Sequence, residues 1–93
     1  MQNTLPDLYE TESQDDPLCQ LKLFLPSSQW SWYVIELSKE DNDTCYGYVE
    51  GLESELGYFS LKELESLRDS LGLRVERDSG FAPTRLSKIR QTV

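Results

Sequence analysis

Carboxylates are the most chemically capable side chains in this sequence, and three of them stand close together. Glu50, Glu53 and Glu55 are near enough along the chain to supply a pair for general acid–base catalysis. Such a pair needs a cleft around it, and no neighbouring motif indicates one. The 93-residue chain contains no histidine, so it cannot by itself form a serine–histidine triad or a cysteine–histidine pair. A hydrolase is the least favoured alternative, and we do not predict an enzyme.

A second group of carboxylates is similar to part of a calcium-binding loop. Glu40, Asp41 and Asp43 are close together, but an EF-hand loop needs a central glycine and a final glutamate at fixed offsets between two helices. Gly47 and Glu50 do not complete that register, and the flanking residues alternate as strands do. We therefore expect a solvated hairpin loop, and we predict neither a metal ion nor a cofactor.

Cysteine content and charge limit the setting of the protein. Cys19 and Cys45 are too few for a disulfide framework, and neither a signal peptide nor a long apolar run is present. We expect two buried thiols in a cytoplasmic protein. The formal net charge of −8 disfavours direct binding to nucleic acid or to an anionic membrane, because both ligands are negatively charged.

The charge is unevenly distributed along the chain. Residues 1–55 contain twelve acidic residues and two lysines, whereas residues 56–93 contain five acidic and seven basic residues. The first part therefore carries a net charge of −10 and the second a net charge of +2, in agreement with the total of −8. Such an asymmetry is informative about partners.

Apolar periodicity predicts the elements that would position these groups. Alternation predicts strands over residues 18–25, 30–37, 44–50 and 73–77. The strongest local signal is an aromatic strand end that leads into Ser60 and Glu63, the two residues of a capping box. Leucines at helical spacing then predict a helix over residues 61–71 that stops at Gly72. A short basic helix is expected over residues 86–90.

These elements predict an α+β fold. Short connections favour an antiparallel meander, so we expect a small antiparallel sheet of about four strands with one main helix packed on one face. The domain is expected to span residues 18–93, after a partly ordered acidic segment over residues 1–17.

Strand parity predicts one aliphatic face, suited to the helix, and one aromatic face. On the aromatic face, tryptophan and tyrosine rings would supply binding area, and the surrounding carboxylates would select a basic or arginine-rich partner. The alternative is that the rings are core beneath the N-terminal segment or the C-terminal tail. The predicted partner-binding residues are Trp30, Trp32, Tyr46, Tyr48, Glu36, Glu40, Asp41, Asp43 and Glu50.

Several motifs carry a resemblance to a known family. They are Leu8-Tyr9-x-Thr11-Glu12, Glu55-Leu56-Gly57-Tyr58-Phe59-Ser60-Leu61, Gly72-Leu73-x-Val75-Glu76-Arg77-Asp78 and Phe81-x-Pro83-Thr84-x-Leu86-Ser87. The chain resembles a family of small bacterial domains of unknown function, often encoded on plasmids and other mobile elements beside genes for DNA handling. The resemblance implies a common fold and that genomic setting, without established catalytic residues. Ser79-Gly80 departs from the histidine or bulky residue that often follows the Glu-Arg-Asp motif.

We therefore expect a non-enzymatic, acidic protein-binding module, monomeric or homodimeric, with a basic protein as its partner. In a mobile-element setting the partner would be a nucleic-acid-binding enzyme, and the module would act as a DNA-mimic-like inhibitor or regulator. The alternative is an accessory nucleic-acid-binding protein. It would use the basic residues of the C-terminal segment, Arg74, Arg77, Arg85, Lys88 and Arg90.

Overall fold

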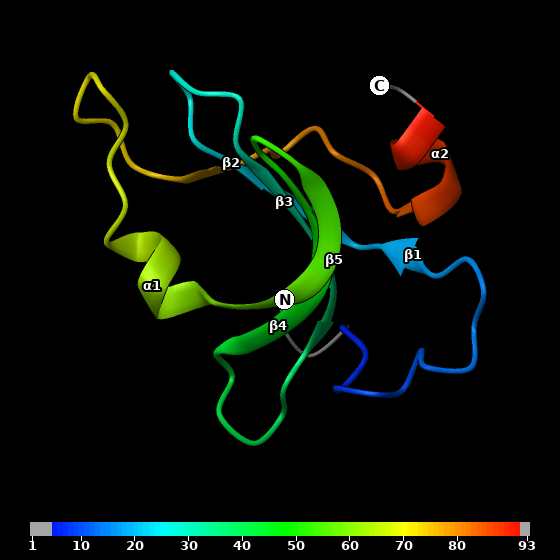
Figure 1. The fold of residues 1–93 in the computed structure, drawn as a ribbon. Helices are drawn as coiled ribbons and strands as arrows, with labels where there is room; N and C mark the ends of the chain where they lie inside the picture. The colour runs from blue at the N-terminus through cyan, green and yellow to red at the C-terminus, as the bar shows by residue number, and fades with distance from the viewer. Residues whose placement is uncertain (1–4, 92–93) are drawn as a thin grey trace.

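Four strands joined by hairpins form most of the main sheet. In the computed structural model, which describes residues 5–91, they are β2 (Leu21–Phe24), β3 (Ser31–Leu37), β4 (Thr44–Glu50) and β5 (Ser54–Ser60). The short strand β6 (Glu76–Arg77) pairs with β2. The sheet is antiparallel with the order β5-β4-β3-β2-β6, so β5 and β6 are its two edges (Figure 1).

A second sheet of two strands lies beside the first. β1 (Leu18–Cys19) pairs with β7 (Thr84–Arg85) in antiparallel orientation. Two strands lead directly into short helices, β5 into α1 (Leu61–Glu65) and β7 into α2 (Leu86–Gln91). Figure 1 shows α1 on one side of the main sheet and β1 and α2 on the other.

The predicted α+β class is confirmed at this coarse level, but the described chain is mostly β. It has seven strands in two sheets and two short helices, where the sequence predicted about four strands and one main helix. The strand over residues 44–50 has its predicted bounds, and the predicted strand over residues 73–77 is reduced to β6. The domain boundary after residue 17 stays a prediction, and residues 1–4 of that segment lie outside the described part.

The helix after β5 begins where the sequence predicted and ends earlier. The Ser60 hydroxyl accepts a hydrogen bond from the Glu63 N–H at 3.3 Å, which confirms the N-cap. Farther along, one carboxylate oxygen of Asp69 accepts the N–H groups of Leu71 and Leu73 at 3.0 and 2.8 Å. These bonds stabilise a turn in place of further helix. Leu71, predicted to lie on the packed side of the helix, is therefore 72% exposed.

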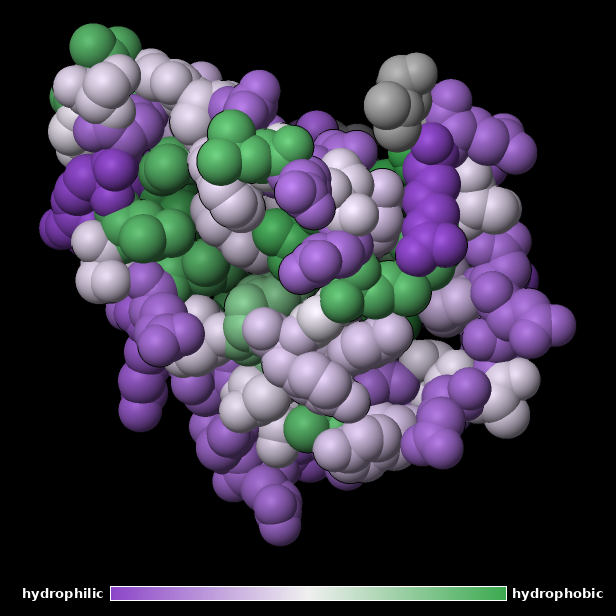
Figure 2. Space-filling model, viewed as in Figure 1, coloured by the Kyte–Doolittle hydropathy of each residue, from purple (hydrophilic) through white to green (hydrophobic). Residues whose placement is uncertain are grey.

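The two faces of the main sheet have different coverings. On the aliphatic face, Trp32 packs with Leu64 of α1. On the other face, Tyr33 and Ile35 pack with Leu86 of α2. We call this second face the tyrosine face because it also carries Tyr46, Tyr48 and Tyr58. Figure 2 shows hydrophobic side chains gathered over α1 and the loop after it, and hydrophilic ones over the loop between β3 and β4.

The predicted sharing of one face by the tryptophans and Tyr46 and Tyr48 is wrong. Trp32 is paired with Val49, whose neighbours in β4 alternate with the tyrosines. The ring of Trp30 packs partly against the cluster around Trp32. Which side chains of neighbouring strands share a face depends on the register between the strands, and an offset of one residue exchanges the faces.

The prediction of one strand over residues 18–25 is also wrong, because this segment forms two strands that belong to different sheets. Cys19 of β1 is fully buried on the tyrosine face, where it belongs to the same cluster as Ile35. Leu21 of β2 packs instead in the cluster on the aliphatic face. The change occurs at Gln20, which lies between β1 and β2 and whose N–H donates to the carbonyl of Val34 at 2.7 Å.

Candidate functional site

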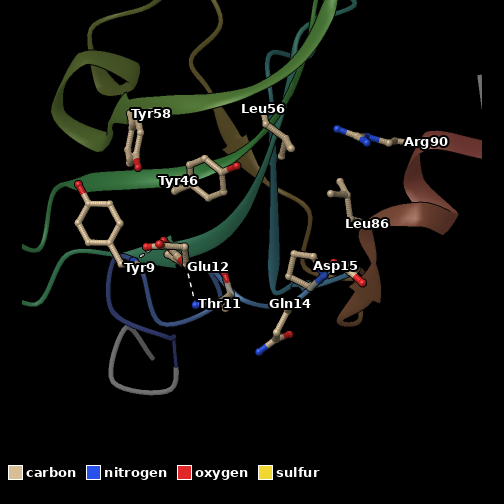
Figure 3. Close-up of a pocket in the computed structure, with 12 residues that line it drawn as sticks. Tyr9, Thr11, Glu12, Gln14, Asp15, Tyr46, Leu56, Tyr58, Leu86 and Arg90 are labelled. Atoms are coloured by element: carbon tan, nitrogen blue, oxygen red, sulfur yellow. Dashed lines mark hydrogen bonds between the residues drawn. The ribbon is translucent and has the colours of Figure 1, made fainter.

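A cleft of about 320 Å³ opens on the tyrosine face. Its walls come from the main sheet, from α2 and from the N-terminal segment, by which we mean residues 5–17. Figure 3 shows that Tyr9, Tyr46 and Tyr58 gather at one end of the cleft, while Arg90 stands at the other. Segments far apart in the sequence therefore meet here.

The carboxylate of Glu36 lies at the base of this cleft and is 2% exposed. One of its oxygens accepts the N–H of Tyr9 at 2.9 Å. The other accepts the N–H of Thr11 at 2.9 Å and also the Thr11 hydroxyl. These bonds attach the N-terminal segment to β3, and hydrogen bonds to a carboxylate are among the stronger ones. All three donors are neutral, so they hold the negative charge without cancelling it.

Glu36 reaches the cleft because β3 contains a bulge. The register between β3 and β4 shifts between Val34 and Glu36. Tyr33 and Ile35 pack on the tyrosine face, and beyond the extra residue Glu36 is paired with Tyr46 on that same face. Strict alternation would instead direct Glu36 to the aliphatic face, where a carboxylate would be buried among leucines.

Three tyrosines form the open end of the cleft. Tyr46 and Tyr58 are paired across β4 and β5, with their ring centroids 5.1 Å apart and their planes at 52°. Tyr58 is 56% exposed and Tyr9 is 62% exposed. Tyr9 has a φ of 71°, in the left-handed region that large side chains rarely occupy. The hydrogen bonds that its N–H and the N–H of Thr11 donate to Glu36 hold the backbone of this turn in place.

The electrostatic environment of the cleft is negative at its tyrosine end. Partial loss of hydration raises the pKa of Tyr58, and the neighbouring Tyr9 hydroxyl and the charge of Glu36 raise it further. The phenol is therefore neutral at physiological pH. Glu12 and Asp15 add two exposed carboxylates to the rim.

The structure separates the four rings that the sequence predicted as one binding face. Trp30 and Trp32 stack on each other on the aliphatic face, with ring centroids 6.0 Å apart. Trp32 and Tyr48 are each 5% exposed, so both are core residues. Of the four predicted rings, Tyr46 lines the cleft.

Two carboxylates predicted as partner-binding hold their own loop together. Asp41 accepts hydrogen bonds from the N–H and the hydroxyl of Thr44 and from the N–H of Asp43, and these bonds lower the pKa of Asp41 to about 2. Asp43 accepts the Ser60 hydroxyl at 2.6 Å and the Lys62 N–H at 2.8 Å. The loop is thereby fixed to the start of α1, which is a structural role.

Of the remaining predicted carboxylates, Glu36 lines the cleft, and the others do not converge on it. Glu40 is exposed in the loop after β3, while Glu50 accepts a hydrogen bond from the Tyr33 hydroxyl at 3.2 Å on the tyrosine face. Glu55 is paired with Val49 and so lies on the opposite face from Glu50. Within residues 5–91, cysteine and carboxylate side chains do not gather in threes as metal ligands would.

Two of the basic residues in the C-terminal segment contact the chain itself. Arg85 donates from Nη1 to the carbonyl of Asp16 at 3.2 Å. The guanidinium of Arg90 lies 5.3 Å from the ring centroid of Tyr48, at cation–π distance. These two cations are thus placed against the N-terminal segment and the tyrosine face.

Sequence reasoning missed Tyr9, Thr11 and Tyr58 as site residues. Their signal was present in two of the motifs that carry the family resemblance, Leu8-Tyr9-x-Thr11-Glu12 and the run through Tyr58. Both motifs contribute side chains to the cleft. Nothing in the sequence indicated that these motifs meet, because the contact depends on how the N-terminal segment crosses the sheet.

The fold and the site define a small, mostly β domain with an open, tyrosine-lined cleft built over a buried carboxylate. Over residues 3–91 the chain matches the family described as a protein of unknown function, DUF2958, and it belongs to that family. The resemblance to a small family of unknown function is thereby confirmed, and its mobile-element setting stays a prediction. Neither a curated protein nor a solved structure matches the chain. Among the described residues, no helix is long and apolar enough to span a membrane.

Proposed function

We propose that this chain is a non-enzymatic binding module that holds a basic protein at the tyrosine-lined cleft. The observation that carries the proposal is the combination of two exposed rings, Tyr9 and Tyr58, with the buried carboxylate of Glu36 beneath them. Exposed aromatic rings supply contact area, and a buried negative charge selects a cation. The net negative charge of residues 1–55 likewise favours a partner whose surface as a whole is positively charged.

The class of partner follows from the charge distribution. Glu12 and Asp15 at the rim, together with the net charge of −10 over residues 1–55, would steer a positively charged surface toward the cleft. Nucleic-acid-binding proteins present such surfaces. The module would then compete with nucleic acid for its partner, as a DNA-mimic-like inhibitor or regulator does.

Affinity capture with matched charge reversals tests this function. The double variant Glu12→Lys/Asp15→Lys reverses the rim of the cleft, and Glu53→Lys/Glu55→Lys makes the same charge change at side chains that do not line it; all four side chains are exposed. At about 50 mM salt, the parent chain and the distal variant should retain basic proteins that the rim variant releases.

Two results would contradict the proposal. Equal loss of binding in both variants would mean that net charge, and not the cleft, holds the partner. Retention of nuclease-sensitive nucleic acid in place of protein would favour the accessory nucleic-acid-binding alternative, which the rim reversal should then strengthen.

A further inference from the structure

We infer that Tyr9, Tyr46 and Tyr58 form an aromatic cage for an alkylammonium group, the head of a lysine side chain on the basic partner, methylated or unmodified. This inference rests on the proposed function and adds the chemistry of the group that enters the cleft. Three observations support it: the arrangement of the rings, the burial and hydrogen bonding of the carboxylate below them, and the cation–π contacts of the other tyrosines on the same face.

The three rings come from three segments and surround one end of the cleft. Tyr46 and Tyr58 stand at 52° to each other, so they form two inclined walls, and they are not a parallel stack. Tyr9 approaches from the N-terminal segment, and Figure 3 shows its ring beside the other two. A cation within about 6 Å of ring centroids is attracted by the negative faces of the rings.

The carboxylate of Glu36 favours an ammonium group over a guanidinium group. Its exposed fraction of 2% leaves no room for direct contact with a ligand, so it acts through its field. Three hydrogen bonds from Tyr9 and Thr11 occupy most of its acceptor positions. A guanidinium group gains much of its advantage from forked hydrogen bonds to a carboxylate, which are unavailable here. An ammonium group has no forked geometry to satisfy, so the field and the rings supply a larger share of its binding.

The turn that presents Tyr9 also supports a binding role. Its φ of 71° is uncommon for a tyrosine, and such conformations persist where the surrounding structure fixes them, often at ligand sites. Here the same carboxylate that supplies the charge also fixes the turn through the N–H groups of Tyr9 and Thr11. The ring position and the field are therefore set by one residue.

Other tyrosines on this face already accept cations from the chain itself. The Nζ of Lys22 lies 5.6 Å from the ring centroid of Tyr33, and the guanidinium of Arg90 lies 5.3 Å from that of Tyr48. Tyr46 and Tyr58 form another cross-strand pair on the same face, and Tyr58 in β5 is open to solvent. An incoming cation would thus make a kind of contact that the fold already makes with one ammonium group and one guanidinium group.

Four soluble probes test the cage by NMR titration of the full chain. Choline and 3,3-dimethylbutan-1-ol have the same shape and differ in charge, while the amides of N-acetyl-lysine and N-acetyl-arginine compare the two basic side chains. We expect choline to bind about tenfold more tightly than its neutral isostere, with shifts centred on Tyr9, Tyr46 and Tyr58. The lysine probe should bind more tightly than the arginine probe. Equal binding of choline and the isostere, or preference for the arginine probe, would overturn the inference.

A pair of variants at Tyr58 separates the cage from the proposed function. Because Tyr58 is 56% exposed, both substitutions should leave the fold intact. Tyr58→Phe keeps the ring and should keep choline binding within about threefold, whereas Tyr58→Leu should weaken it about tenfold. If the capture of basic proteins survives Tyr58→Leu and is lost only in Glu12→Lys/Asp15→Lys, the cage is refuted while the proposed function stands. If choline binds and the lysine probe does not, the assignment to a protein side chain is refuted.

Discussion

Replacing Glu36 by glutamine should loosen the N-terminal segment from the sheet. The two carboxylate oxygens together accept two N–H groups and one hydroxyl, from Tyr9 and Thr11. A glutamine has one acceptor oxygen and one NH2 group, so in either orientation the NH2 group faces at least one N–H donor. Leaving a buried donor unpaired costs about 1–3 kcal/mol, and we expect Glu36→Gln to lower the free energy of unfolding by about 2 kcal/mol.

Urea unfolding and amide hydrogen exchange together measure this effect. For a urea m value of about 1.3 kcal/mol/M, the unfolding midpoint should fall by about 1.5 M. In the variant, the exchange rates of the Tyr9 and Thr11 amides should increase more, relative to the parent, than those of the core strands, because the loss is local. Glu40→Gln removes the same charge at an exposed position and should change the stability by less than about 0.5 kcal/mol. If Glu36→Gln has the same urea midpoint as the parent chain, and the amides of Tyr9 and Thr11 keep their protection from exchange, the assigned role of the carboxylate is wrong.

Two further predictions concern the sheet and the thiols. A Cβ at Gly47 would lie 1.9 Å from a backbone oxygen of β3, whereas one at Gly57, its partner in register, would meet nothing within 4 Å. Gly47→Ala should therefore cost about 3 kcal/mol in urea unfolding and Gly57→Ala should be neutral, and equal effects would contradict the packing. Burial raises the pKa of Cys19 and of Cys45 to about 12. Each thiol ionises at a lower pH in the unfolded chain, so the free energy of unfolding should be constant below about pH 9. Above that pH it should fall by about 1.4 kcal/mol per pH unit for each thiol. The double variant Cys19→Ala/Cys45→Ala should flatten that slope.

The features that were predicted correctly depend on neighbours in the sequence. The cap at Ser60 and Glu63 needs four consecutive residues, and the strand over residues 44–50 follows from alternation within its own span. The helix after Ser60 was predicted too long because its end depends on a competing turn. Asp69 binds backbone N–H groups beyond α1, and leucine spacing cannot reveal that competition.

The candidate site was predicted only in part, through Glu36 and Tyr46, because its other determinants are non-local. The tryptophans were assigned to the wrong face since parity within one strand does not give the register with the next. The bulge that redirects Glu36 inserts a residue into β3 without a glycine or proline to mark it. The contact with Tyr9 spans 27 residues of sequence. Composition did indicate tyrosines among carboxylates, and side chains of both kinds line the cleft.

Glu36 links the folding of the N-terminal segment to the selection of a ligand. A neutral amide would suffice to accept one or two hydrogen bonds, but three donors arranged around two oxygens require a carboxylate. The negative charge beneath the rings is thus a consequence of how the segment is held. Any group that enters the cleft is exposed to that charge, so a variant at Glu36 alters both the fold and the binding. Substitutions at Tyr58, which is exposed and does not bond to the Glu36 carboxylate, can measure recognition separately from the attachment of the segment to β3.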